Sequence, residues 1–103
     1  MKPRVQVVQQ GDAIRVQIEG VLDHDATSDL TGKTRDLVSS VNSDVALDLG
    51  RVEYISSECV GVLITLGRKI KEKGYAMRVV AASEIVDSVL TVCGFFKIFN
   101  RDF

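Results

Sequence analysis

The chain has 103 residues, of which 46% are apolar and 26% charged, and 13 basic against 14 acidic side chains give a net charge of -1. This length and composition predict one domain, residues 1–103, and exclude a disordered or collagen-like chain. A chain this close to neutral has no basic field to attract phosphate backbones or anionic lipids, so we expect neither nucleic-acid nor membrane binding.

Cellular location and cofactor use also follow from the composition. No apolar stretch reaches the roughly 20 residues that a membrane helix needs, and the first residues alternate between polar and apolar types, unlike a signal peptide. We therefore expect a cytoplasmic protein. Cys59 and Cys93 lack metal-ligand spacing and are expected to be free thiols in a reducing compartment, and we expect no metal or other cofactor.

The first half of the chain predicts a hairpin, a helix and a strand. Apolar residues alternate with polar ones over residues 5–10 and 14–18, on either side of the turn signal Gly11-Asp12. Between Leu30 and Val41 the apolar residues recur every three or four positions, which indicates an amphipathic helix. Residues 45–49 are mostly apolar and predict an interior strand followed by a short loop.

The second half continues the alternation of helices and strands. Residues 57–73 predict a second helix, 77–81 a further strand, 85–92 a third helix, and 96–99 an edge strand. The order is ββαβαβα with a last β. This order predicts an α/β fold in which helices pack on a mixed sheet of four to five strands.

Two adjacent serines, Ser56 and Ser57, stand where the second helix begins. A serine oxygen at a helix start accepts a hydrogen bond from an amide that has no partner inside the helix, so either serine can be an ordinary cap. The same free amides and the positive end of the helix dipole stabilise a phosphate ester on a serine, with a charge of roughly -2. The residues therefore support both a cap and a phosphorylation site.

Three separated segments, residues 20–26, 48–63 and 92–98, carry a resemblance to a known family. The first resembles a Gly-x-Leu-Asp turn and the third a Gly-Leu-x-x-Ile segment. The middle one resembles the pattern Asp-Leu-x-x-Val-x-x-Ile-Asp-Ser-Ser-Gly-Leu-Gly-Val-Leu. All three are features of STAS domains, the fold of bacterial anti-sigma factor antagonists, also called anti-anti-sigma factors. The resemblance covers nearly the whole chain.

The resemblance implies a binding regulator in signal transduction and transcription regulation, and not an enzyme. Its unphosphorylated form would bind a serine kinase of the anti-sigma type, phosphorylation at the second helix would release that partner, and a phosphatase would restore the first state. Alignment from Gly61 places the phosphorylated serine on Ser57, with Ser56 as the less favoured choice. The implied partner-binding residues are Asp23, Ser56, Ser57, Glu58 and Gly61.

The chain departs from the family pattern at three positions. Ser56 stands where the family has aspartate, Glu58 where it has a second serine or threonine, and Cys59 where it has glycine. Ser56 thereby becomes a competing acceptor. The charge of Glu58 stabilises the helix start by roughly 0.3 to 1 kcal/mol but repels a phosphate on its neighbour.

Two other interpretations compete with a phosphorylation switch. A STAS module without a phosphate cycle could act as a constitutive adaptor, which the altered serine motif favours. A receiver domain phosphorylated on Asp48 is disfavoured because receivers do not begin with a hairpin. His24, the sole histidine, is expected to be a solvated loop residue, and Asp23 either contacts a partner or bonds its own turn. The oligomeric state stays open.

Overall fold

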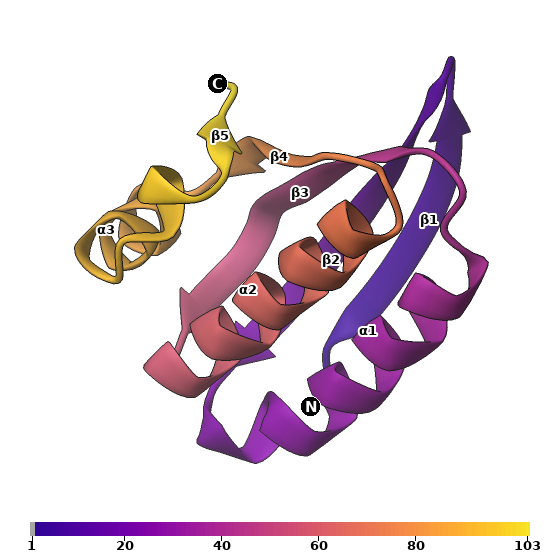
Figure 1. Ribbon diagram of the computed structural model, residues 1–103. Helices are drawn as coiled ribbons and strands as arrows, with labels where there is room; N and C mark the ends of the chain where they lie inside the picture. Colours follow the sequence, from indigo (N-terminus) through magenta and orange to yellow (C-terminus); the bar gives the residue numbers. More distant parts are fainter. Residues whose placement is uncertain (1) are drawn as a thin grey trace.

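Five strands form one mixed sheet in the computed structural model, which describes residues 2–103 (Figure 1). The strands are β1 (Arg4–Gln10), β2 (Ala13–Leu22), β3 (Asp44–Ile55), β4 (Met77–Ala82) and β5 (Asn100–Arg101). They lie side by side in chain order; β1 and β2 are antiparallel, and the later neighbours are parallel. The predicted mixed sheet is confirmed.

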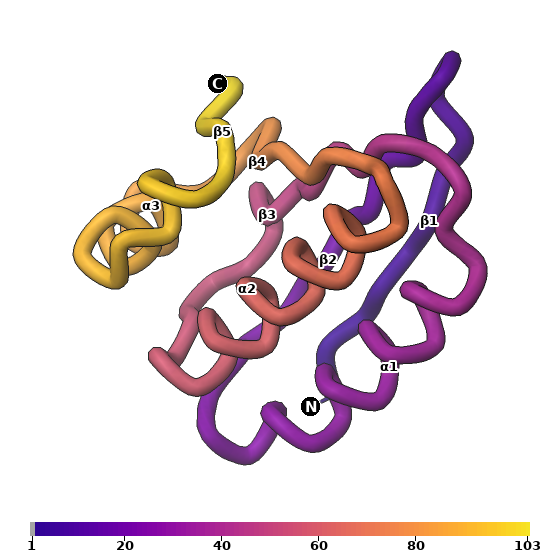
Figure 2. Tube along the Cα trace, in the orientation of Figure 1, coloured from indigo at the N-terminus to yellow at the C-terminus, as the bar shows by residue number. Residues whose placement is uncertain are grey.

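The helices connect the parallel strands. They are α1 (Thr27–Ser40), α2 (Ser57–Glu72) and α3 (Glu84–Val92), with the short 3-10 helices η1 (His24–Ala26) and η2 (Phe95–Lys97). Figure 2 shows α1 and α2 next to one another across the sheet, with α3 beyond the β3 side. The element order therefore agrees with the predicted ββαβαβαβ order, and α1 begins three residues before Leu30. Among residues 2–103, no helix is long and apolar enough to cross a membrane.

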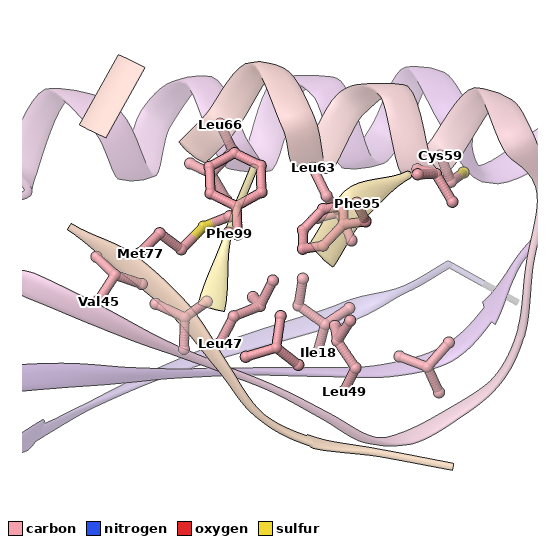
Figure 3. Close-up of a cluster of buried hydrophobic side chains, with 14 of the residues drawn as sticks. Ile18, Val45, Leu47, Leu49, Cys59, Leu63, Leu66, Met77, Phe95 and Phe99 are labelled. Atoms are coloured by element: carbon pink, nitrogen blue, oxygen red, sulfur yellow. The ribbon is translucent and has the colours of Figure 1, made fainter. Parts of the chain in front are cut away.

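The hydrophobic core lies between the sheet and the helices. Alternate residues of β2, namely Ile14, Val16 and Ile18, point into it, as the predicted alternation requires. Figure 3 shows Leu63 of α2 and Phe95 of η2 in this layer, and both side chains are fully buried. One continuous core therefore fixes the positions of the helices on the sheet.

The predicted edge strand at 96–99 is wrong. Phe95–Lys97 is a 3-10 helix, and the edge strand is Asn100–Arg101. Phe95 and Phe99 are both buried with ring centroids 4.8 Å apart, and a spacing of four residues brings two side chains together on a helical turn. Gly94 precedes the turn with a φ of 77°, a left-handed conformation that glycine adopts without strain.

The loop predicted after residue 49 is also wrong, because β3 continues to Ile55. Val52 pairs with Gly20, and Ile55 pairs with Leu22, so the later part of β3 follows β2 to its end. Both Val52 and Ile55 are buried, although the residues between them are exposed. The register shifts between β2 and β3 account for the three-residue spacing of these two buried side chains.

Candidate modification and partner-binding site

The site forms where two parallel strands end at the same edge of the sheet. The amide of Ser56 donates to the carbonyl of Leu22 at 2.8 Å, which ties the end of β3 to the end of β2. As a result η1, which follows β2, lies beside the first turn of α2, which follows β3. The structure thereby brings together Asp23 and the segment 56–61, the two parts of the chain in which the sequence predicts partner-binding residues.

The two serines have different surroundings. Ser56 is the N-cap of α2, with φ −82° and ψ 161°, and its Oγ accepts a hydrogen bond from the amide of Cys59 at 3.2 Å. Only 8% of Ser56 is exposed. Ser57 is the first helical residue and is exposed, and within residues 2–103 its hydroxyl has no hydrogen-bond partner. The cap that the sequence assigned to either serine therefore belongs to Ser56.

Cys59 joins α2 to the turn that contains Asp23. The Cys59 side chain is completely buried, and its Sγ donates to the carbonyl oxygen of Asp23 at 3.4 Å and lies 3.7 Å from the hydroxyl of Thr27. Asp23 in turn caps η1, because its Oδ1 accepts from the amide of Ala26 at 3.1 Å. The turn-bonding role of Asp23 is thus present, and a partner contact through its second carboxylate oxygen stays a prediction.

His24 and Glu58 form an ion pair that sequence reasoning did not anticipate. Nδ1 of His24 contacts Oε2 of Glu58, and the two side chains are 82% and 47% exposed. The hydrogen bond to Glu58 raises the pKa of His24 above its ordinary 6.5, with the Glu58 charge adding to the effect. The bond from His24 lowers the pKa of Glu58 below 4.5. The two residues are far apart in the sequence, so only the fold reveals this contact.

A groove between α1 and α2 begins at the same place. Its volume is about 530 Å³, and it includes Glu58 and Gly61 at one end and Lys69 at the other. A Cβ added at Gly61 would meet nothing within 4 Å, so this glycine leaves open space on the helix surface. Figure 1 shows the two helices that form the walls. Two of the five predicted partner-binding residues therefore line one accessible groove.

Asp48, the acceptor of the receiver-domain alternative, is already engaged. Its Oδ2 accepts hydrogen bonds from Nε and Nη2 of Arg15 at 3.0 and 2.8 Å, and its Oδ1 accepts from the amide of Gly50 at 2.9 Å. The Asp48 side chain is only 8% exposed. Within the described residues, 2–103, no three histidine, cysteine, aspartate or glutamate side chains lie close enough to hold a metal ion.

Comparisons with known proteins agree with this architecture. A family model described as "Mlab, STAS domain" matches residues 5–99. An anti-sigma factor antagonist from Mycobacterium paratuberculosis has a similar solved structure, with a TM-score of 0.84 and 19% identity over 96% of this chain and 84% of that chain.

The anti-sigma factor antagonist SpoIIAA of Bacillus is similar in two forms. The unphosphorylated form gives a TM-score of 0.75 with 16% identity, over 97% of this chain and 89% of that chain. The phosphorylated form gives 0.68 with 15% identity, over 97% and 92%. Identities this low show the common fold, whereas the family model spans most of the chain. This chain therefore belongs to the STAS domain family.

Proposed function

We propose that this protein is a phosphorylation-switched binding regulator of the anti-sigma factor antagonist kind. In its unmodified form it binds a serine kinase of the anti-sigma type, and that kinase phosphorylates Ser57 and is released. The observation that carries the proposal is the exposed hydroxyl of Ser57 beside a separate capping serine, Ser56. Membership of the STAS family supports it, as does the similarity to an antagonist solved in both phosphorylated and unphosphorylated forms.

The surroundings of the two serines favour Ser57 as the acceptor. The Ser56 oxygen accepts the amide hydrogen bond of Cys59 and is nearly covered, so a kinase would have to break the cap to reach it. Ser57 needs no such rearrangement. Its place at the start of α2 also puts a new phosphate near the positive end of the helix dipole, where negative charge is stabilised.

Release of the partner follows from the charge that the modification adds. A phosphoryl group brings roughly -2 to a surface that is otherwise in contact with the partner. A charge of this size introduced into a packed interface loses its hydration and is not fully compensated there, which weakens the complex. The proposed partner surface combines Glu58 and Gly61, which line the groove, with Asp23, Ser56 and Ser57, which lie where β2 and β3 end.

In this proposal the protein is the substrate of the reaction and not its catalyst. The Oγ–P bond forms on Ser57 as the bond to the departing nucleoside diphosphate breaks, and the hydroxyl proton passes to a base of the kinase. A phosphatase then hydrolyses the ester with water. Binding of the kinase in the cytoplasm would free the transcription factor that the kinase holds, so the output is regulation of transcription.

A second candidate, the constitutive adaptor, is favoured by one observation. Glu58 follows Ser57 directly and is negatively charged whether or not the serine is modified, so it opposes a second negative charge there. An adaptor would bind its partner complex through the same surface without a phosphate cycle. The two candidates differ in whether the protein carries phosphate in its own cells.

The test is the intact mass of the protein isolated from its own cells, with a phosphate-affinity gel, for wild type and three variants. Ser57→Ala removes the proposed acceptor, Ser56→Asn removes the other hydroxyl while keeping a good N-cap, and Ser39→Ala is a control at an exposed serine on α1. Phosphate lost only in Ser57→Ala supports the switch. Loss only in Ser56→Asn moves the acceptor by one residue, and no phosphate under any growth condition favours the adaptor.

A further inference from the structure

His24 is held in place by the contacts that join η1 to α2. The carbonyl of Leu22 accepts a hydrogen bond from the amide of Ser56, and the carbonyl of Asp23 accepts one from the thiol of Cys59. The two residues before His24 are therefore hydrogen-bonded to residues that lie before and after Ser57 in the chain. The imidazole then reaches the carboxylate of Glu58. The backbone geometry thus fixes this one histidine next to the first turn of α2.

The charges around His24 are mostly negative. Asp23 and Asp25 flank it in the chain, Glu58 contacts it from α2, and Lys2 lies beside the hollow that Asp23 and Asp25 line. Within residues 2–103, Glu58 forms an ion pair with His24 and with no lysine or arginine. Arg35 of α1 lines the same groove as Glu58, but the positive group that contacts the first turn of α2 is the imidazolium of His24.

We propose that His24 is the intramolecular phosphate-binding residue of this site, paired with Glu58 in the unmodified protein and with the phosphoryl group of Ser57 after modification. This inference rests on Ser57 as the modified residue. A phosphate dianion carries more charge than a carboxylate and offers three strong acceptor oxygens, so it competes for the same imidazolium. Ser57 directly precedes Glu58 at the start of α2, so a phosphate on Ser57 would be attached one residue from the carboxylate that His24 already contacts.

This change of partner by His24 reduces the repulsion between Glu58 and a phosphate on Ser57. Without a cation, the carboxylate of Glu58 and a phosphate on Ser57 would repel one another across adjacent residues. With His24 beside them, this repulsion is reduced, because the imidazolium moves from the carboxylate to the phosphate. Because the imidazole is largely exposed, its move changes the charge that a partner meets on this side of the site.

The test uses full-length protein with genetically encoded phosphoserine at position 57, so no kinase is required. Since the chain has a single histidine, the imidazole proton signals give one unambiguous titration by NMR. In unmodified protein, Glu58→Gln should lower the pKa of His24 toward its ordinary 6.5, because Glu58 makes the two largest upward contributions, while Asp23 and Asp25 remain. With phosphoserine at 57, the pKa of His24 in Glu58→Gln should stay above its value in unmodified Glu58→Gln, because the phosphate replaces the lost carboxylate. Glu72→Gln, at the far end of α2, is the matched control and should change neither value.

A second readout concerns the phosphate itself. The second phosphate pKa, followed by phosphorus NMR, should be lower in the presence of His24 than in His24→Gln, because the imidazolium favours the dianion. Phosphoserine at position 39 is a control that should leave His24 unchanged. If the pKa of His24 in the doubly altered protein falls to that of unmodified Glu58→Gln, the phosphate does not bind His24 and the inference is overturned. Neither result depends on whether a kinase modifies Ser57 in cells, so failure here is distinct from failure of the proposed function.

Discussion

The thiol of Cys59 lies 3.4 Å from the carbonyl oxygen of Asp23 and connects the first turn of α2 to the turn after β2. This hydrogen bond and the one from the Ser56 amide to the Leu22 carbonyl hold the turn that contains Asp23 and His24 beside the start of α2. Cys59 is fully buried, whereas the other cysteine, Cys93, is exposed at the end of α3. Cys59 is therefore a suitable test site, and Cys93 is its control.

Replacing Cys59 with alanine should lower the free energy of unfolding by about 1 to 2 kcal/mol. The substitution leaves a small cavity and deprives the Asp23 carbonyl of a donor, and both effects destabilise a packed interior. Urea unfolding followed by circular dichroism measures the change. Cys93→Ala should stay within about 0.5 kcal/mol of wild type. Equal stability of the two variants would show that the Cys59 contact contributes nothing to the fold.

The N-cap at Ser56 predicts a difference between the two serines. Ser56→Ala should cost about 1 kcal/mol because the amide of Cys59 loses its acceptor, while Ser57→Ala should change stability by less than about 0.5 kcal/mol. Ser56→Asp should keep near wild-type stability, since aspartate is as good an N-cap as serine. Urea unfolding followed by circular dichroism measures the free energy of unfolding of all three variants. A larger loss in Ser57→Ala than in Ser56→Ala would contradict the assigned cap.

The order of elements was predictable because the hydrophobic period differs so clearly between β2 and α2. The sequence failed where an apolar run is short. Phe96 to Phe99 matches a strand and a helical turn equally well, and only the packing of Phe95 on Phe99 selects the turn. The extension of β3 to Ile55 was missed because its exposed residues look like a loop, and the pairing with β2 that makes them a strand is a long-range property.

The site was predictable as a segment but not as a set of contacts. Both serines matched the pattern of a helix start, yet the one that caps depends on the backbone dihedral angles at Ser56, which the sequence does not contain. The pairing of His24 with Glu58 depends on β2 and β3 ending together. Residues expected to act singly, such as a solvated histidine and a repulsive glutamate, are in fact one ion pair.

Two glycines of α2 should respond in opposite directions to alanine. A Cβ at Gly67 would overlap the ring of Phe99 and come within 2.7 Å of the end of Met77, whereas a Cβ at Gly61 would meet nothing within 4 Å. Overpacking costs about 1 to 3 kcal/mol, and because the overlap at Gly67 is with a buried ring, this cost should exceed the gain of about 1 kcal/mol from replacing a helical glycine. Gly67→Ala should therefore lower the melting temperature and Gly61→Ala raise it. Thermal unfolding of both variants checks this, and stabilisation by Gly67→Ala would contradict the observed packing of Phe99.

The ion pair of His24 and Glu58 should make stability depend on pH within a defined window. The pKa of His24 is raised in the folded protein, so its contribution is fully present below 6.5 and is lost as the pH rises through the raised value. The pKa of Glu58 is lowered, so its contribution is present above 4.5 and is lost as the pH falls through the lowered value. The stabilisation should thus be greatest between pH 4.5 and 6.5.

The measurement is the difference in urea midpoint between wild type and His24→Gln from pH 4 to pH 9. The difference should be largest near pH 5.5, disappear above the raised pKa of His24, and shrink in about 1 M salt, where the Debye length is about 3 Å. Both side chains are in contact with solvent, so the effect is small and needs this direct comparison. A difference that stays constant over the whole range would mean that His24 contributes by packing alone, and its charge would then have no influence on the start of α2.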